Sequence, residues 1–559
     1  MNIPTFQSSL ATKSRQQPNY RFGGLYKVIS EEEWLKQALE KVLENTGART
    51  AGIDGIARDD LRSGKRRNAL ARRLHASLRS GNYHPKPVRR VYIPKPGKDE
   101  MRPLGIPTIA DRVVQEALRM VMEPIWESKF LRCSHGFRPG HRTMDCVYLC
   151  RTRIQPRNKF YWVIEGDIRK CFDRINHRIL INQIERGTDD HRLLDLCSVM
   201  LEAGVMEDGL VSPSLEGTPQ GGIISPLWAN IYLHDFDQWH WDNYTGLTRK
   251  DKAWRRKHGL GNAVMTRYAD DFIVLTNGTH SGTQHMKDEI AEFMQGKLKL
   301  ELNMEKTHVT HVQDGFDFLG FHMLWRTKKG RASKAWLQIT PTKGNIHKVK
   351  DKIRDLTGGR MFYIPDRELF QAANAIIRGW AHYYQHVNAT ETFSSLDWWL
   401  NQRLVRRLQR KYNQPIGKIL TKYRQRQTVN ARGKPCNRWN LYADSIWLFL
   451  ASDVKKVKYY PTREQWETNP YSKAQEGAAS LPEHLPYGHD TMVYITQETC
   501  ELAERRRQVL KRDEYTCQEC GSKITLEVHH RKRRSAGGKH NPANLVTLCQ
   551  ECHKKRTYS

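Results

Sequence analysis

Two adjacent acidic residues interrupt an apolar stretch near the middle of the chain. The segment reads Met265-Thr-Arg-Tyr-Ala-Asp-Asp-Phe-Ile-Val-Leu275, so Asp270 and Asp271 stand between two runs typical of β-strands. This pattern predicts a β-hairpin with both carboxylates at its tip. Neighbouring carboxylates repel each other and lose hydration in apolar surroundings, so they favour a bound cation. Because Asp is also a common turn residue, an ordinary polar turn remains an alternative for this segment alone.

An earlier apolar segment ends in a third acid. Tyr161-Trp-Val-Ile-Glu-Gly-Asp167 predicts a strand that delivers Asp167 at its end. Two strands that bring carboxylates to one place can hold two divalent ions roughly 3.5–4 Å apart, an arrangement that supports in-line phosphoryl transfer. Mg²⁺ favours such sites, where a few carboxylates share it with substrate phosphates. These acids are therefore candidate metal ligands.

The charge of the chain limits its partners. Its 559 residues are enough for roughly three or four domains. A formal net charge of +32 and a pI of about 9.7 predict a polyanionic partner, most simply nucleic acid; an anionic membrane surface is the competing partner. The sequence has no run of about 18 apolar residues, and residues 1–17 lack the apolar core of a signal peptide. We therefore expect a soluble, intracellular protein with no membrane partner.

A glycine-rich segment lies between the two acidic strands. It reads Glu216-Gly-Thr-Pro-Gln-Gly-Gly-Ile-Ile-Ser-Pro and continues apolar to Leu233, which predicts a loop that opens a helix. Ser225 and Pro226 suit the N-cap and first helical position. Gln220 could hydrogen-bond a nucleotide or a template.

In this order the three segments resemble motifs A, B and C of reverse transcriptases. The strand with Asp167 resembles motif A, the glycine-rich loop motif B, and Tyr-Ala-Asp-Asp motif C. The resemblance implies an α+β right-hand polymerase, with fingers and a palm built on an antiparallel sheet. It implies that two Mg²⁺ ions activate the primer hydroxyl and stabilise the departing pyrophosphate. The implied metal ligands are Asp167, Ile168, Asp270 and Asp271, and the three acids are the implied catalytic residues.

Residues before motif A resemble the fingers of these enzymes. An amphipathic helix is expected over residues 31–45, and a second, very basic helix ends near Gly81. Residues 88–94 and 102–107 read as two extended segments joined by a turn. By the resemblance, Lys95 and Arg102 contact the incoming nucleotide, although ordinary surface cations would read the same way.

Two further residues are implied to act on the nucleotide. Phe172 stands five residues beyond Asp167, where a bulky aromatic would collide with a ribose 2′-OH and so favour dNTPs over NTPs. It could instead be a core aromatic. Lys306 lies in a later palm block and is a candidate for neutralising or protonating the leaving pyrophosphate, or a plain surface lysine.

Other segments resemble group II intron proteins in particular. Cys133-Ser-His-Gly-Phe-Arg-Pro-Gly140 resembles the S-x-G-F-R-P block of group II intron reverse transcriptases. Helices are expected over residues 366–387 and 396–412, where Arg and Lys alternate with Trp and Tyr. Residues 378–384 are similar to the thumb, or domain X, of group II intron maturases. Such a mixture suits RNA, although we expect most of the aromatic residues to be buried.

The C-terminal segment has the residues of a metal centre and a nuclease. Seven of the eleven cysteines are scattered, but Cys517, Cys520, Cys549 and Cys552 form two Cys-x-x-Cys pairs, which predicts a structural Cys₄ zinc site rather than disulfides. The residues between and after the pairs resemble an HNH nuclease, a hairpin and helix around one divalent ion. The implied roles are general base for His530, orientation of the hairpin for Asn544, and ligation of Mg²⁺ or another divalent ion for His529 and His553. A purely structural zinc ribbon would explain the cysteines but not these histidines and the asparagine.

The resemblance covers nearly the whole chain and identifies it as a bacterial-type group II intron-encoded protein. It implies reverse transcriptase fingers and palm over residues 1–335 and an α-helical thumb/maturase domain over 336–450. It places a DNA-binding region and linker over 451–505 and a small zinc-stapled ββα-metal HNH domain over 506–559. Two alternatives are a reverse transcriptase of another lineage with a fused nuclease, and a non-enzymatic splicing factor that keeps the fold to bind RNA.

The implied function is intron mobility. Such a protein binds its group II intron RNA, promotes splicing, and nicks target DNA with its HNH domain, so that the freed 3′-OH primes cDNA synthesis from dNTPs. We expect a cytoplasmic, nucleoid-associated ribonucleoprotein that holds one protein copy or two.

Overall fold

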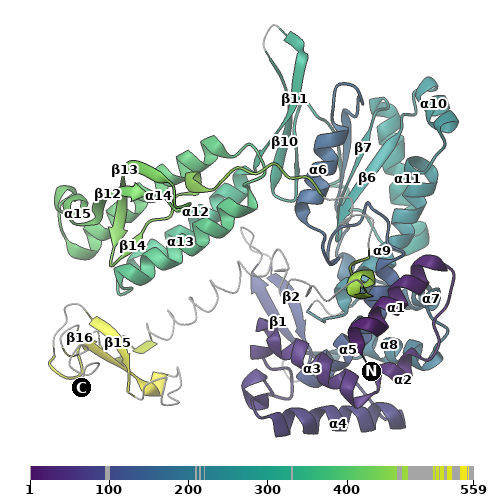
Figure 1. The fold of residues 1–559 in the computed structure, drawn as a ribbon, viewed down its shortest axis with the longest axis horizontal. Helices are drawn as coiled ribbons and strands as arrows, with labels where there is room; N and C mark the ends of the chain where they lie inside the picture. The colour runs from purple at the N-terminus through teal and green to yellow at the C-terminus, as the bar shows by residue number, and fades with distance from the viewer. Residues whose placement is uncertain are drawn as a thin grey trace. The chain divides into compact units, whose positions relative to one another are not determined.

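The computed structural model describes most of the chain (Figure 1). Its residues fall into two compact units, and each is described by itself. The first comprises Met1–Gln338 with Tyr459–Leu485, and the second comprises Ile339–Lys458 with Pro486–Ser559. The described residues are 2–94, 101–207, 210–212, 216–218, 221–328, 331–461, 469–475, 508–509, 512–514, 516–521, 526–531, 542–549 and 552.

A four-stranded antiparallel sheet lies at the centre of the first unit. Its order is β6-β7-β3-β8, with β6 at Ala263–Tyr268, β7 at Asp271–Thr276, β3 at Trp162–Gly166 and β8 at His308–His311. The apolar residues of β3 and β7 are buried, as expected for strands with helices packed against them. Both strands predicted from the acidic segments are confirmed.

Helices surround this sheet and share one apolar core with it. The central helix α5, Ile109–Glu127, has almost every side chain buried. The same core includes residues of α3 (Glu32–Glu44), α9 (Ser225–His240) and α11 (His280–Leu298). The remaining helices of the unit are α1 (Ile3–Gln16), α2 (Leu25–Ile29), α4 (Gly64–Ser80), α6 (Thr143–Arg153), α7 (His177–Glu185), α8 (His191–Leu201) and α10 (Arg249–Lys257).

Two smaller sheets complete the first unit. In the order β2-β1-β4-β5, β1 (Val88–Pro94) pairs antiparallel with β2 (Met101–Ile106), which confirms the two extended segments predicted there. Short strands β4 (Val205–Glu207) and β5 (Leu210–Ser212) extend this sheet. The third sheet has the order β11-β10-β9, formed by Arg331–Pro341, Phe321–Lys328 and Phe316–Phe318.

A late segment of the chain also packs on the first unit. The short helix η7, Pro470–Gln475, contacts α1. Asn469 Nδ2 donates hydrogen bonds to Pro124 O at 2.9 Å and Ser128 Oγ at 2.7 Å. The sequence resemblance assigns this part of the chain to a DNA-binding region and linker and does not indicate this packing, because the partners of Asn469 lie more than 300 residues away.

The second unit is largely helical. It contains α12 (Lys343–Thr357), α13 (Asp366–Tyr383), α14 (Thr390–Tyr412) and α15 (Ile416–Tyr423), followed by a sheet of β12 (Arg424–Val429), β13 (Pro435–Ala443) and β14 (Ile446–Trp447). Near the C-terminus, β15 (Leu526–His530) pairs antiparallel with β16 (Leu545–Cys549).

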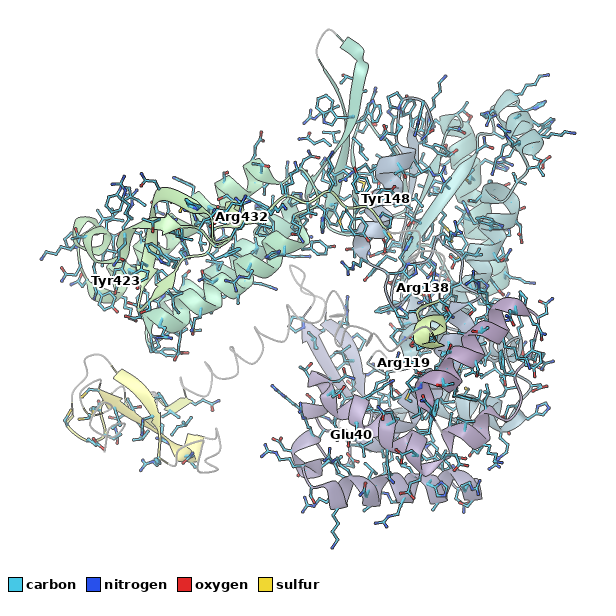
Figure 2. The ribbon with its side chains drawn as sticks, viewed as in Figure 1. Glu40, Arg119, Arg138, Tyr148, Tyr423 and Arg432 are labelled. Atoms are coloured by element: carbon cyan, nitrogen blue, oxygen red, sulfur yellow. The ribbon has the colours of Figure 1, made fainter. Side chains whose placement is uncertain are left out.

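Asp366 ties three helices of this unit together. Its carboxylate accepts hydrogen bonds from Lys411 Nζ at 2.8 Å, Tyr412 OH at 2.7 Å and Tyr423 OH at 2.6 Å (Tyr423 is labelled in Figure 2). Burial would raise the pKa of this carboxyl, but these donors hold it below its usual value. The start of α13 is thereby fixed to the ends of α14 and α15.

Helix boundaries differ from the sequence-based expectations in several places. The N-cap of α9 is Ile224, so Ser225 and Pro226 each stand one position further into the helix than predicted, because the Ile224 carbonyl already accepts the Trp228 N–H. Helix α11 begins at His280, where the Thr279 side chain caps it. Helix α13 ends at Tyr383 and α14 begins at Thr390.

The aromatic residues of the second unit are only partly buried. Trp380 and Tyr384 are enclosed as expected, whereas Trp398 is 67% exposed. No helix within the described residues combines the length and the apolar character needed to cross a bilayer.

Candidate active site

The register of the central sheet brings the three predicted acids together. Strands β3 and β7 pair Gly166 with Phe272, so Asp167, directly after β3, and Asp271, the first residue of β7, occupy the next position of the same ladder. Tyr268 pairs with Asp271 across the β6–β7 hairpin, which leaves Asp270 in the two-residue turn. The predicted hairpin with carboxylates at its tip is confirmed, and all three acids meet at one end of the sheet.

Electrostatic coupling among the acids follows from this placement. Burial and then the charges of Asp270 and Asp167 raise the pKa of Asp271 to about 7, although its side chain still has solvent-accessible surface. Burial and the charge of Asp167 also raise the pKa of Asp270. Ionised carboxylates are therefore destabilised here unless cations join them, and an all-oxygen donor set of this kind suits Mg²⁺. Ile168 is 4% exposed, so only its backbone carbonyl could join the set.

Two cationic side chains act on the acids. Lys306 Nζ lies 2.9 Å from Asp167 Oδ2. Its charge opposes the rise in the pKa of Asp271, but burial and the other two acids outweigh it. The charge of Arg102 in β2 similarly opposes the rise in the pKa of Asp270. Two of the residues predicted to contact nucleotide thus lie within electrostatic reach of the acids. Lys95 and Gln220 lie outside the described residues.

The loop predicted as motif B approaches both β2 and the segment after β3. Thr218 N donates to the carbonyl of Phe172 at 2.8 Å. A Cβ at Gly221, whose φ is +120°, would lie 2.6 Å from the Gly105 carbonyl oxygen in β2. Only glycine allows this approach. Phe172 is half-buried and makes an edge contact with Phe137, with ring centroids 6.3 Å apart.

A buried arginine beneath the acidic turn was not found from the sequence. The Arg267 guanidinium donates to both carboxylate oxygens of Asp237, at 2.8 and 2.5 Å, and its side chain is fully enclosed. It also donates to the carbonyl of Ala269, the residue before Asp270, at 2.8 Å. Burial would lower the pKa of Arg267, but Asp237 raises it above its usual value, so the guanidinium stays charged. Further donors of the same group reach Asn230 Oδ1 and Ser134 Oγ.

The S-x-G-F-R-P loop also supports this turn. A Cβ at Gly136 would lie 2.1 Å from Ala269 N, so the loop backbone touches the turn directly. Ala269 itself has φ +58°, an uncommon value for a residue with a side chain. Arg138, labelled in Figure 2, fixes the loop through two hydrogen bonds to Glu127, at 3.0 and 2.6 Å. The turn is thus held between the loop and Arg267.

The same loop contains a buried histidine pair. The Nδ1 atoms of His135 and His141 lie 3.0 Å apart, and Asp145 lies beside them. Burial lowers the pKa of His135 to about 3, so one neutral imidazole donates to the other. Tyr459 OH donates to Asp145 of α6 at 2.6 Å, which links the late segment of the chain to the helix beside the histidine pair.

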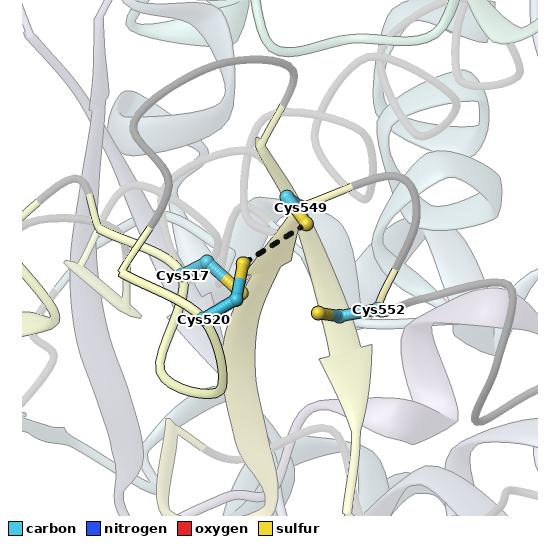
Figure 3. A group of neighbouring side chains, drawn as sticks. All are labelled: Cys517, Cys520, Cys549 and Cys552. Carbon is cyan, nitrogen blue, oxygen red and sulfur yellow. Dashed lines mark hydrogen bonds between the residues drawn. The ribbon is translucent and has the colours of Figure 1, made fainter.

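The four predicted zinc ligands converge (Figure 3). The sulfur atoms of Cys517, Cys520, Cys549 and Cys552 all lie within 4.8 Å of one another, and Cys520 Sγ lies 3.5 Å from Cys549 Sγ. A tetrahedral zinc ion with bonds of about 2.3 Å needs sulfurs roughly 3.8 Å apart, so the cluster fits this metal. The ten cysteines that the structure describes are free of disulfides.

Three of the four predicted nuclease residues, His529, His530 and Asn544, lie in or directly beside the β15–β16 hairpin. His530 in β15 pairs with Leu545 in β16, so Asn544, directly before β16, stands at the same end as His530. Arg531 N donates to the Asn544 carbonyl at 2.7 Å and closes that end. His529 is half-buried, whereas His553 and the side chain of His530 lie outside the described residues.

Comparison with known proteins agrees with this geometry. Residues 93–323 match the family of reverse transcriptases (RNA-dependent DNA polymerases). Residues 346–425 match the group II intron maturase-specific domain, and residues 517–559 match the HNH endonucleases. The chain is thus a reverse transcriptase that also carries an HNH endonuclease region.

Individual relatives extend the comparison. Protein YkfC of Escherichia coli (strain K12) is 39% identical over 341 residues, which cover 58% of this chain and 89% of that protein. The group II intron-encoded protein LtrA of Lactococcus lactis subsp. cremoris is 29% identical over 446 residues, 67% of this chain and 72% of LtrA. A putative COX1/OXI3 intron 2 protein of Saccharomyces cerevisiae is 28% identical over 336 residues, 53% of this chain and 38% of that protein. The chain belongs to the multifunctional group II intron-encoded proteins, with reverse transcriptase, maturase and HNH regions.

Removal of the buried arginine should separate stability from activity. Arg267→Ala leaves Asp237 buried without its cation and should destabilise the fold by about 3–5 kcal/mol. In Arg267→Met/Asp237→Leu, apolar packing should restore the thermal unfolding midpoint, because neither charge remains buried. Primer extension should stay low in both variants, since the Ala269 carbonyl has lost its donor. A double variant that is stable and fully active would contradict the positioning role.

Protons should compete with Mg²⁺ at the acids. Since the pKa of Asp271 is raised to about 7, its carboxyl is protonated below that pH and ionised above it. Mg²⁺ must then displace one proton, so its apparent affinity should fall about tenfold per pH unit below about pH 7 and level off above it. Titrations of primer extension with Mg²⁺ between about pH 6 and 8.5 test this. A magnesium requirement that does not change over this range would contradict the coupling.

The cysteine cluster should bind one zinc ion independently of the polymerase site. Cys520→Ser should remove zinc measured by mass spectrometry and abolish DNA nicking, because the β15–β16 hairpin loses its anchor. The matched control is Cys436→Ser, a free cysteine outside the cluster. Primer extension should persist in both variants. Retention of zinc by the Cys520 variant would show that the metal is held elsewhere.

Proposed function

We propose that this chain carries out retrohoming of a group II intron. It binds its intron RNA and promotes splicing, and the ribonucleoprotein inserts the intron into one strand of the target DNA. The HNH region nicks the other strand. The freed 3′-OH then primes cDNA synthesis from dNTPs. The observation that carries the polymerase part is the sheet register that brings Asp167 next to Asp271, with Asp270 in the adjoining turn.

The acids would hold the metal ions of this reaction. Asp167, Asp270, Asp271 and the backbone of Ile168 are the proposed ligands of two Mg²⁺ ions, which supply positive charge to the primer hydroxyl and the departing pyrophosphate. Lys306, already 2.9 Å from Asp167, adds a further cation for the pyrophosphate. Its ammonium group can also donate a proton to that leaving group.

The nucleotide would bind between the acids and the β1–β2 hairpin. Arg102 and Lys95 of the hairpin are proposed to neutralise its triphosphate. Phe172 is proposed to pack against the sugar and exclude a 2′-OH, and Gln220 to contact the nucleotide or the template. In this proposal the two N-terminal sheets act as the fingers and palm of a right hand, with the helical second unit as the thumb.

Crowded cations support RNA binding by the helical unit. Burial and the neighbouring charges of Arg354, Arg410 and Arg406 lower the pKa of Arg403. Like charges at this density destabilise a bare helix surface, whereas phosphates would neutralise them and release counterions. The exposed Trp398 lies on the same helix, α14, and can stack on an unpaired base.

The HNH region is proposed to cut DNA with one divalent ion. His530 would activate water, His529 and His553 would bind Mg²⁺ or another divalent ion, and Asn544 would orient the hairpin. The Cys₄ cluster would hold structural Zn²⁺. Because its partners are intron RNA and genomic DNA, we propose a nucleoid-associated ribonucleoprotein of the cytoplasm.

Two variants should divide the proposed activities. Asp270→Ala/Asp271→Ala should reduce primer extension by at least about 10³-fold, because the metal ligands are lost. The control is Asp195→Ala/Asp314→Ala, which removes two exposed acids of the same unit. His530→Ala should abolish nicking and leave extension of an annealed primer intact. Equal extension by the acid variant and its parent would end the polymerase proposal, and loss of both activities in His530→Ala would mean that the sites are not independent.

A further inference from the structure

Helix α10 is largely exposed: apart from the half-buried Lys252 and Arg255, all of its residues are open to solvent. It carries six cationic residues and one acid within Arg249–Lys257, and none of its side chains is buried. It connects α9 to β6, and in Figure 1 it lies at the edge of the first unit, far from the β1–β2 hairpin. A nine-residue helix gains its stability mainly from packing, and α10 packs only through the half-buried side chains of Lys252 and Arg255. Its existence therefore needs another explanation.

Several contacts hold this helix in place and use part of its charge, among them the Arg255 guanidinium over the Tyr244 ring at 4.8 Å. Thr248 caps the N-terminus and binds Asp251, with hydrogen bonds of 2.6 and 3.2 Å. Lys252 Nζ donates to the Thr245 carbonyl at 2.6 Å. Arg255 Nε donates to the Gly261 carbonyl at 2.9 Å. Thus the sole acid and two of the six cations of α10 fix the helix to its own connecting loops.

The other cations have no such task. Arg249, Lys250, Arg256 and Lys257 make no ion pair with any acid in the described part of the chain. Arg249 and Lys250 also lie in the first turn, where the helix dipole disfavours positive charge. Their placement opposes helix stability, so a ligand that offsets it must be anionic.

An aromatic stack stands among these cations. Trp254 is 56% exposed, and its ring packs against that of His258, with centroids 4.2 Å apart and the ring planes tilted by 31°. The exposed indole offers a flat face on which an unpaired base can stack, whereas the bases of duplex DNA are already stacked on one another. Cations and a stacking face together match a loop or bulge of folded RNA better than a double helix.

We infer that α10 is a docking arm for an unpaired loop of the intron RNA. Arg249, Lys250, Arg256 and Lys257 bind its phosphates, and Trp254 stacks on one of its bases. The arm lies on the polymerase unit but apart from the acids, so it anchors RNA without entering the reaction. This inference rests on intron RNA being the partner of the chain.

The test compares two double variants of the full chain. Arg249→Ala/Lys250→Ala removes two cations that destabilise the helix, so loss of folding is not expected. Lys287→Ala/Lys297→Ala removes the same charge from α11 in the same unit. The probe is the intron transcript that encodes the chain. The arm variant should bind it about tenfold more weakly near 150 mM salt, with the slope of log K against log salt reduced by about 1.5, and the control should match the parent.

Trp254→Ala supplies an independent readout. It should weaken binding of the same transcript about tenfold through the lost stacking, and chemical probing should find one unpaired stretch newly reactive. Extension of a short annealed primer should be unchanged in every variant. If the parent does not bind the transcript, the proposed partner itself is wrong. If the parent binds but the arm and control variants are equal, or if duplex target DNA alone loses affinity, the docking arm is wrong.

Discussion

Mutual repulsion of three carboxylates is the constraint around which the first unit is built. Asp167, Asp270 and Asp271 meet because the sheet register leaves them no alternative. Burial and the charge of Asp167 raise the pKa of Asp270, and burial and the charges of Asp270 and Asp167 raise the pKa of Asp271. Without support, the two carboxylates carried by the turn would move away from Asp167 or take up protons. The surrounding structure prevents this movement. The repulsion between the ionised carboxylates therefore persists, and bound metal ions would relieve it.

The support is itself electrostatic and lies on the opposite side of the turn from solvent. Arg267 holds the Ala269 carbonyl from below, and α9 supplies Asp237 to keep that guanidinium charged. A buried ion pair of this kind is seldom worth more than apolar packing of equal volume. Its value here is geometric, because a branched planar cation can reach four groups from three segments of the chain at once. Gly136 closes the turn from the remaining side, where any Cβ would overlap Ala269.

Sequence reasoning succeeded where a local pattern determined the outcome. Alternating and continuous apolar runs gave β3, β6 and β7, and the spacing of the cysteine pairs gave the Cys₄ cluster. Arg267 escaped notice because an arginine next to Tyr-Ala-Asp-Asp looks like a surface cation; its burial depends on Asp237, 30 residues away on α9. The packing of Asn469 on α5 was not predicted for the same reason, since nothing near Asn469 in the sequence indicates its partners. The predicted start of α9 was wrong by one residue, because its first backbone hydrogen bond is accepted by the Ile224 carbonyl, and a backbone carbonyl leaves no signal in the sequence.

Like charges held together are informative wherever they occur in this chain. Three acids in one place imply cations, and by the same logic unpaired cations imply an anion. The net charge of +32 alone requires only a polyanion somewhere. Its distribution says more: Arg403 is crowded by other guanidinium groups on α12 and α14, while Arg249 and Lys250 oppose the dipole of α10. Since each arrangement is unfavourable in the isolated protein, binding of phosphate would relieve it. The two units would then hold RNA through separate surfaces, and the acids would remain free for the chemistry.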